Sequence, residues 1–375
     1  MSLSERRLSL HRIRRMVQKE IRQLFRDPKT KRIIFVAPVV QLILLGYAVT
    51  TDVRNVTTAV VDHDRTVASR ELISTFTASG YFRIVEASDR SADLGHALDE
   101  GRAVIALEIP YGYEADLKAG RGATVQLLAD GTNSNTATVA QGYAAKITQE
   151  LGIRILTARG GTIPIDLRAR AWYNPSLESQ VYNVPAVIGV IVLLMCLLLT
   201  SMAVVREREI GTLEQLLVSP LSAGELMLGK TLPVAGIAMV QMALVTGVAL
   251  LWFQIPLRGS ALLLTGAALL FVLAGLSLGL YISTISSTQQ EAFLSMYLFI
   301  LPAIILSGFF YPVESMPPLF QQMTLVNPLR HFLEIVRGIF LKGAGFMDLW
   351  IQFTVLAGMS LGGLTLATRR FRRTL

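Results

Sequence analysis

Residues 204–220 have the sequence VVREREIGTLEQLLVSP, and a long apolar run lies on either side of this charged stretch. Four successive ionised side chains, from Arg206 to Glu209, would carry a large free-energy penalty in the hydrocarbon core of a bilayer. We therefore expect the stretch at a membrane face, between two membrane spans. Its acidic and apolar residues recur at helical spacing, which predicts a short amphipathic helix that rests on the bundle and presents its carboxylates to a soluble partner.

The composition of the chain is that of a membrane protein. Of its 375 residues, 52% are hydrophobic and 17% are charged, and the mean hydropathy is +0.50. Several apolar runs approach the roughly 20 residues that a helix needs to cross a bilayer. The one cysteine, Cys196, lies inside such a run, so the chain forms no intrachain disulfide. Six spans are expected, at Ile33–Thr50, Val184–Val205, Leu232–Phe253, Ala261–Thr284, Ala292–Phe310 and Phe346–Thr368.

The positive charge is concentrated at the two ends of the chain. Eleven Lys and Arg residues lie in residues 1–32 and four in residues 369–375, together 15 of 35. This is the pattern of the positive-inside rule, which predicts that both termini are cytoplasmic. Two cytoplasmic ends require an even number of spans. The same distribution explains the net charge of +8 without nucleic acid as a partner.

The N-terminal segment is expected to stay on the protein and to form a helix. Its basic region is long and no A-x-A site follows the first apolar run, so a cleaved signal peptide is disfavoured. Apolar residues from Ile13 to Phe25 recur at helical spacing, which predicts an amphipathic helix in the cytoplasmic interface. Asp27-Pro28 is expected to end it. The alternative is a disordered basic tail.

Residues 52–181 form the one large polar insert, which the topology puts outside the cytoplasm. Strand-like runs alternate with helical patterns, which predicts a small α/β domain with its own core. Strands are expected at Thr58–Val61, Phe82–Val85, Ala103–Ile109 and Thr124–Leu128, and helices at Ser91–Glu100, Tyr111–Leu117 and Thr136–Leu156. Asp62-His63-Asp64 is interpreted as a solvated turn rather than a metal site, because the other histidines have no ligand spacing to it.

One motif imitates a nucleotide-binding loop. Residues 224–231, GELMLGKT, match G-x-x-x-x-G-K-[ST]. A phosphate loop needs a flexible turn after a buried strand, whereas the variable positions here are bulky helix formers and a membrane span follows. We interpret Lys230 as a basic anchor at the cytoplasmic end of that span. The sequence has no H-E-x-x-H motif and no paired histidines, so it predicts neither an enzyme nor a bound metal or cofactor.

Three other classes of function have weaker support in the sequence. A self-contained ATPase would need the match at residues 224–231 to be genuine. An ion-coupled secondary transporter normally needs buried acids or histidines, and the expected spans contain almost no ionisable groups. A membrane-anchored sensor would use the external domain for binding, but six spans are more than a tether needs.

Gly275-x-x-x-Gly279 and Gly358-x-x-x-Gly362 would allow close packing of helices.

The chain resembles the permease subunits of type-2 ABC exporters, in the drug-efflux-like branch with a large external domain. The resemblance covers nearly the whole length and rests on several motifs in order. These are Lys19-Glu20 through Arg26-Asp27-Pro28, Ile109-Pro110, Leu128 to Thr136, Trp172 to Pro175, Arg206 to Pro220 with Gly229-Lys230, Ser307-Gly308 through Met316-Pro317, and Asn327-Pro328 to Arg337-Gly338.

The resemblance implies an all-α polytopic membrane bundle of six transmembrane helices with an inserted extracytoplasmic α/β domain. The implied division is a cytoplasmic tail and interfacial helix at 1–32, a first span at 33–51, the external domain at 52–181, a bundle at 182–368 with a coupling segment at 205–230 and an external re-entrant hairpin at 311–345, and a basic tail at 369–375.

The resemblance also implies partners. ATP and magnesium would be bound by separate ATP-binding cassette subunits, and a second permease, either a copy or a paralogue, would complete a path for a hydrophobic or amphipathic substrate such as a drug. A periplasmic adaptor is a further possible partner, and the location implied is the bacterial inner membrane. The residues expected to couple the chain to the ATP-binding subunit are Lys19, Glu20, Arg26, Asp27, Arg206, Glu207, Arg208, Glu209, Gly211, Thr212, Glu214 and Gln215.

Overall fold

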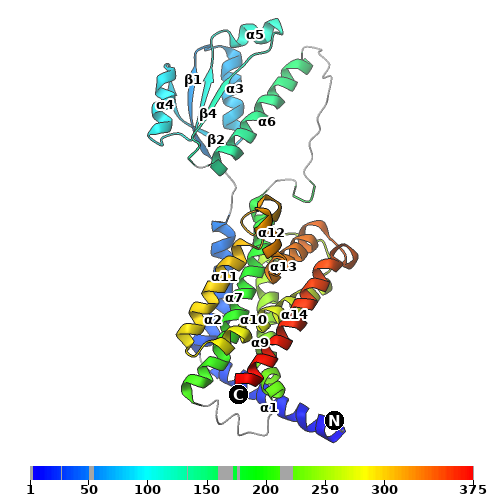
Figure 1. The fold of residues 1–375 in the computed structure, drawn as a ribbon. Coiled ribbons are helices and arrows are strands. Elements are labelled where there is room, and N and C mark those ends of the chain that lie inside the picture. The colour runs from blue at the N-terminus through cyan, green and yellow to red at the C-terminus, as the bar shows by residue number, and fades with distance from the viewer. Residues whose placement is uncertain are drawn as a thin grey trace. The chain divides into compact units, whose positions relative to one another are not determined.

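The computed structural model describes residues 3–26, 28–49, 55–132, 134–158, 172–174, 178–211 and 223–374 (Figure 1). The chain divides into two compact units. A helical unit comprises residues 1–50 and 171–375, and an α/β unit comprises residues 51–170.

The helical unit is built from long apolar helices and a cluster of short ones. Its long helices are α1 (Leu3–Arg26), α2 (Pro28–Ala48), α7 (Ser179–Ile210), α9 (Ala223–Leu251), α10 (Ala261–Ile285), α11 (Gln289–Ile305) and α14 (Phe346–Thr374). The short elements between α11 and α14 are the 3-10 turn η1 (Val313–Ser315), α12 (Pro318–Thr324), α13 (Pro328–Arg337) and the π-helical turn η2 (Gly338–Lys342). The N- and C-termini lie at one end of this unit, and α12 and α13 lie at the other (Figure 1).

Five of the described helices are long and apolar enough to cross a membrane: α2, α7, α9, α10 and α14. The remaining span that we expected, Ala292–Phe310, corresponds to α11, an apolar helix of 17 residues. At 1.5 Å per residue α11 is about 26 Å long, a little short of a hydrocarbon core of about 30 Å. The chain then turns at Gly308, whose positive φ of 78° ends any continuation of the helix.

Helix α7 forms the centre of the helical core. Residues such as Val187, Ile191 and Leu197 are wholly buried in one cluster with residues of α2, α9, α10 and α13. Two glycines of α10 permit close contact with α7: a Cβ on Gly275 would lie 3.1 Å from Cys196 Cβ, and one on Gly279 would lie 2.8 Å from Thr200 Cβ. This Gly-x-x-x-Gly pair therefore packs within the chain, as small residues do between membrane helices.

The α/β unit has a four-stranded sheet in the order β2-β1-β3-β4, with β1 parallel to β2 and β3 and with β4 antiparallel to β3. Its elements are β1 (Val56–Asp62), α3 (Val67–Ala78), β2 (Phe82–Ser88), α4 (Ser91–Asp99), β3 (Ile105–Ile109), α5 (Tyr113–Ala119), β4 (Gln126–Ala129) and α6 (Ser134–Ala158). Helices α3 and α6 cover one face of the sheet and α4 covers the other (Figure 1). All four expected strands are present.

Helix α3 was not expected. Its sequence, VASRELISTFTA, is rich in Ser and Thr, which are weak helix formers. Two features nevertheless fix it as a helix. Thr66 and Ser69 form a reciprocal capping box at its start, and Leu72 and Phe76 are buried against the sheet.

The Asp62-His63-Asp64 segment is a hydrogen-bonded turn at the end of β1. Asp62 Oδ1 accepts hydrogen bonds from the backbone N–H groups of Asp64 and Arg65 at 3.0 and 2.9 Å. Asp64 accepts from the backbone N–H groups of Gly112 and Glu114 at 2.9 and 3.0 Å. The Asp64 carboxylate therefore ties the end of β1 to the start of α5. No cluster of three metal-ligating side chains occurs among the described residues.

Candidate functional site at the ends of α1, α7 and α9

Helix α1 packs against α9 at a glycine. Met16 of α1 is buried with Leu226 and Met227 of α9, and a Cβ added to Gly229 would lie only 2.5 Å from Met16 Cγ. The amphipathic N-terminal helix is therefore confirmed as a helix, and the alternative of a disordered tail is wrong for residues 3–26. The apolar side of α1 contacts α9 through Met16.

Four charged side chains join α1, α7 and α9 in a closed ring, which we call the charge ring: Lys19 and Glu20 of α1, Glu207 of α7 and Lys230 of α9. Lys230 Nζ lies 2.8 Å from Glu207 Oε1 and 3.8 Å from Glu20 Oε1. Lys19 Nζ lies 3.3 Å from Glu207 Oε1 and 3.4 Å from Glu20 Oε1. Charges of opposite sign thus alternate around the ring.

The two residues of the ring that belong to α7 and α9, Glu207 and Lys230, form its inner pair and are buried. Glu207 is 8% exposed and Lys230 is 3% exposed, and Lys230 also donates a hydrogen bond to the Ala203 carbonyl at 3.1 Å. A buried ion is tolerated when it is paired and hydrogen-bonded. Lys230 is therefore more than a membrane anchor, because it is the charge that allows Glu207 to be buried.

Two expectations about the charged stretch are wrong. Glu207 does not present its carboxylate outward, because that group is buried against Lys230. Residues up to Ile210 are not a separate short helix either, because α7 runs unbroken from Ser179 to Ile210. Gly211 then ends α7 in the left-handed conformation, with φ of 77°. A glycine suits this position because it adopts the left-handed conformation without steric strain.

The last residues of α7 also bind the turn between α10 and α11. Arg208 Nη1 donates to the Ser286 carbonyl at 3.0 Å, and Glu209 Oε1 accepts from the Gln289 backbone N–H at 2.8 Å. Arg206 is exposed. Helix α7 is thus attached at this end to α1, α9, α10 and α11.

Of the twelve expected coupling residues, the structure brings Lys19, Glu20 and Glu207 together and holds Arg208 and Glu209 nearby. Arg26 is the exposed last residue of α1. Asp27, Thr212, Glu214 and Gln215 lie outside the described residues. Sequence reasoning missed the partners Lys230, Ser286 and Gln289. Lys230 had a usable signal, because a lone lysine at the start of an apolar helix needs a carboxylate at the same depth.

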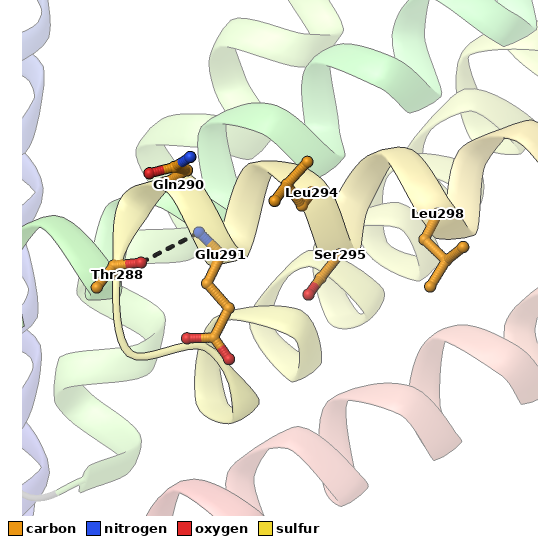
Figure 2. A pocket seen from close by; sticks show the side chains of 6 residues that line it. All are labelled: Thr288, Gln290, Glu291, Leu294, Ser295 and Leu298. Atoms are coloured by element: carbon orange, nitrogen blue, oxygen red, sulfur yellow. Dashed lines mark hydrogen bonds between the residues drawn. The ribbon is translucent and has the colours of Figure 1, made fainter.

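A second candidate site is a shallow hollow of about 330 Å³ on the exposed side of α11. Six residues line it: Thr288, Gln290, Glu291, Leu294, Ser295 and Leu298. Figure 2 shows Glu291 and Ser295 projecting on the same side of the helix, where Thr288 caps it by accepting from the Glu291 N–H. Leu294 and Leu298 are 60% and 78% exposed. This side of α11 therefore combines polar groups with uncovered leucines.

Comparison with known proteins identifies the family. The model of the ABC-2 family transporter proteins matches residues 32–369. The chain belongs to the ABC-2 transporter family. This ABC-2 protein is therefore a multi-pass membrane permease, in agreement with its apolar helices.

Three relatives of this ABC-2 permease come from Escherichia coli K12. The "Probable multidrug ABC transporter permease YbhR" is 34% identical over 97% of this chain and 99% of its own length. The "Probable multidrug ABC transporter permease YbhS" is 33% identical over 90% of both chains. The "Inner membrane transport permease YhhJ" is 33% identical over 84% of this chain and 85% of its own.

Proposed function

We propose that this permease is the membrane-spanning subunit of an ATP-driven exporter, energised by separate ATP-binding cassette subunits. The observation that carries the proposal is the charge ring, which joins α1 and the start of α9 to one end of the central helix α7. A soluble subunit that pushes on α1 or on the end of α7 would therefore move the helix at the centre of the bundle. Family membership supports the same class of transporter.

The energy source is proposed to lie outside this chain. The motif at residues 224–231 belongs to helix α9, which begins at Ala223, so the motif is helical throughout and lacks the flexible loop that wraps a phosphate. Among the described spans, the charged groups lie near helix ends, with none at mid-helix. A proton or ion relay through the membrane normally needs such buried groups.

We propose a topology in which α11 is the sixth span, both termini and the charge ring are cytoplasmic, and the α/β unit is external. The terminal positive charge supports this orientation. The two termini also lie at the same end of the helical unit (Figure 1). The membrane is proposed to be a bacterial inner membrane, because three relatives are proteins of Escherichia coli and one of them is named an inner membrane permease. A periplasmic adaptor is proposed as a partner of the external unit.

A second permease chain is proposed to cover the exposed side of α11. Polar groups such as Glu291 and Ser295 would be costly against lipid, whereas a facing copy or a water-filled path would accommodate them. The exposed leucines of the same side suit a hydrophobic or amphipathic substrate. Two relatives are named multidrug permeases, and we propose that this chain also exports drug-like molecules.

The test is reconstitution in vesicles with and without the ATP-binding subunit. We expect the permease alone to hydrolyse no ATP, and the complex to export a fluorescent amphipathic cation only when ATP is supplied. Dependence of export on a proton gradient, with no requirement for ATP or for the second subunit, would contradict the proposal.

A further inference from the structure

The residues that imitate a phosphate loop have a different task in this structure. The 224–231 motif contains two glycines. A Cβ on Gly224 would meet open space, whereas the space that a Cβ on Gly229 would need is occupied by Met16 of α1. The lysine of the motif reaches Glu207 and Glu20. Glu225, which lies between the two glycines in the sequence, has its carboxylate 3.9 Å from the Arg12 guanidinium of α1. Gly229, Glu225 and Lys230 of the motif thus each make a contact with α1.

The charge ring divides into two neutral pairs, one on each side of this contact. Lys19 and Glu20 are neighbours on α1, 3.4 Å apart, and they stay together wherever α1 goes. Lys230 and Glu207 are the shortest pair at 2.8 Å, and both belong to the α7–α9 body. The contacts between the two pairs, at 3.3 and 3.8 Å, are both longer than the 2.8 Å contact of the Lys230–Glu207 pair.

This division has an energetic consequence. Removing one partner from a buried ion pair is strongly destabilising, because it leaves an unpaired buried charge. If α1 left α9, each of these two pairs would stay neutral, whereas Glu225 of α9 would lose its contact with Arg12 of α1. The cost of separation is therefore the loss of the two contacts between the pairs, of the Arg12–Glu225 contact and of the Met16 packing. The Lys19 side chain is already 48% exposed, which lowers the cost of its contact.

We infer that residues 224–231 form a docking site for α1, with Gly229 as a notch for Met16 and Lys230 as a charge for Glu20, and that α1 undocks and redocks during the transport cycle. Docking is a property of this chain alone. Its reversal during transport rests on the proposed function, and the experiments below separate the two.

Docking is tested on the purified full-length permease in detergent. In a Cys196→Ala background, Leu226→Cys places a thiol where α1 covers α9, since Leu226 is 3% exposed and packs with Met16. We expect Gly229→Ala to raise the rate of maleimide labelling severalfold, because its Cβ displaces Met16. The matched control is Gly224→Ala, in the same helix and separated from Gly229 by four residues. A Cβ on Gly224 would meet open space, so this variant should leave the labelling rate unchanged. Equal rates in the two variants would overturn the docking site.

Charge reversal tests the division into pairs. Exchanging the inner pair, with Glu207→Lys and Lys230→Glu together, keeps that pair neutral but makes it repel Lys19 and Glu20. We expect this double variant to fold, by size-exclusion chromatography and melting temperature, and to label rapidly at Leu226→Cys. Reversing Lys19→Glu and Glu20→Lys as well should restore slow labelling. Slow labelling of the double variant, or rapid labelling of the quadruple variant, would overturn the role of the ring.

Undocking is tested in the assembled transporter. Arg12→Cys and Glu225→Cys, whose native side chains approach to 3.9 Å, are joined with a short cross-linker that a reductant cleaves. We expect cross-linking to abolish ATP-driven export and cleavage to restore it. Export at the unlinked rate while α1 is tethered would overturn undocking and leave the proposed function intact. Lack of ATP-driven export by the complex that contains the wild-type permease would instead overturn the proposed function.

Discussion

At the scale of single residues, two cations lie against α7, one near each end of the helix. Lys230 pairs with Glu207, and Arg337 of α13 lies over the ring of Tyr182, 3.8 Å from its centre. Arg337 Nη1 also donates to the Gly308 carbonyl at 3.0 Å, just beyond the end of α11. A single guanidinium thus connects α7, α13 and the turn after α11.

Arg337→Lys is predicted to destabilise the helical unit by about 1–2 kcal/mol, because an ammonium cannot both stack on Tyr182 and reach the Gly308 carbonyl. The measurement is the melting temperature of the purified permease. Arg258→Lys is the control, since Arg258 is exposed and lies 5.9 Å from the centre of the Tyr173 ring. Equal melting temperatures for Arg337→Lys and the wild type would contradict the prediction.

Gly211 offers a second test at this scale. Its left-handed backbone predicts that Gly211→Ala weakens the end of α7 by roughly 1 kcal/mol. Asparagine tolerates this conformation, so Gly211→Asn should keep most of the ATPase stimulation of the partner, whereas Gly211→Ala should lose more of it. If the glycine instead serves close approach of a partner, the larger asparagine would be the more harmful of the two.

At the scale of elements, the sequence predicted what local patterns encode. Alternating and β-branched runs located the four strands, and apolar length located the helices of the bundle. Contacts between distant residues were beyond such reasoning. Glu207 and Lys19 are 188 positions apart, and nothing in a hydropathy pattern relates them. The burial of Glu207 was therefore missed although its position at the end of a span was anticipated.

The turn after β1 carries a prediction for the α/β unit. Burial raises the pKa of Asp64, but hydrogen bonds from the Thr66 hydroxyl and from the N–H groups of Glu114 and Gly112 outweigh it, so its pKa lies below the ordinary value. A carboxyl group with a lowered folded-state pKa contributes stability at pH values above its unfolded pKa of about 3.9 and loses that contribution as the pH falls further.

Asp64→Ala is therefore predicted to weaken the start of α5 by about 1 kcal/mol at pH 7, and the difference from wild type should shrink below about pH 4. Hydrogen–deuterium exchange of α5 amides in the full chain, corrected for intrinsic rates, measures both effects. Asp99→Ala, at the exposed end of α4, is the control. A difference that persists undiminished at the lowest pH would rule out the carboxylate as its source.

At the scale of the whole molecule, the arrangement of the membrane helices predicts which positions reach each side. In a Cys196→Ala background, Thr132→Cys should react with an impermeant thiol reagent in intact cells, because the α/β unit is proposed to be external. Arg206→Cys, which is exposed in the structure, should react only after permeabilisation. The reverse pattern would invert the proposed orientation.

The unbroken course of α7 has a mechanical meaning. Its 32 residues give a length of about 48 Å, well beyond a hydrocarbon core of about 30 Å. Its one internal proline, Pro185, lies in the first two turns, so the rest is a stiff rod. Glu207 lies near one end of this rod, and Tyr182 lies in the first turn of α7, just before Pro185, at the other end. A tilt of the rod moves both ends at once and in opposite directions, as a lever does, so a displacement at the charge ring reaches the Arg337 contact without a relay of rearranging side chains.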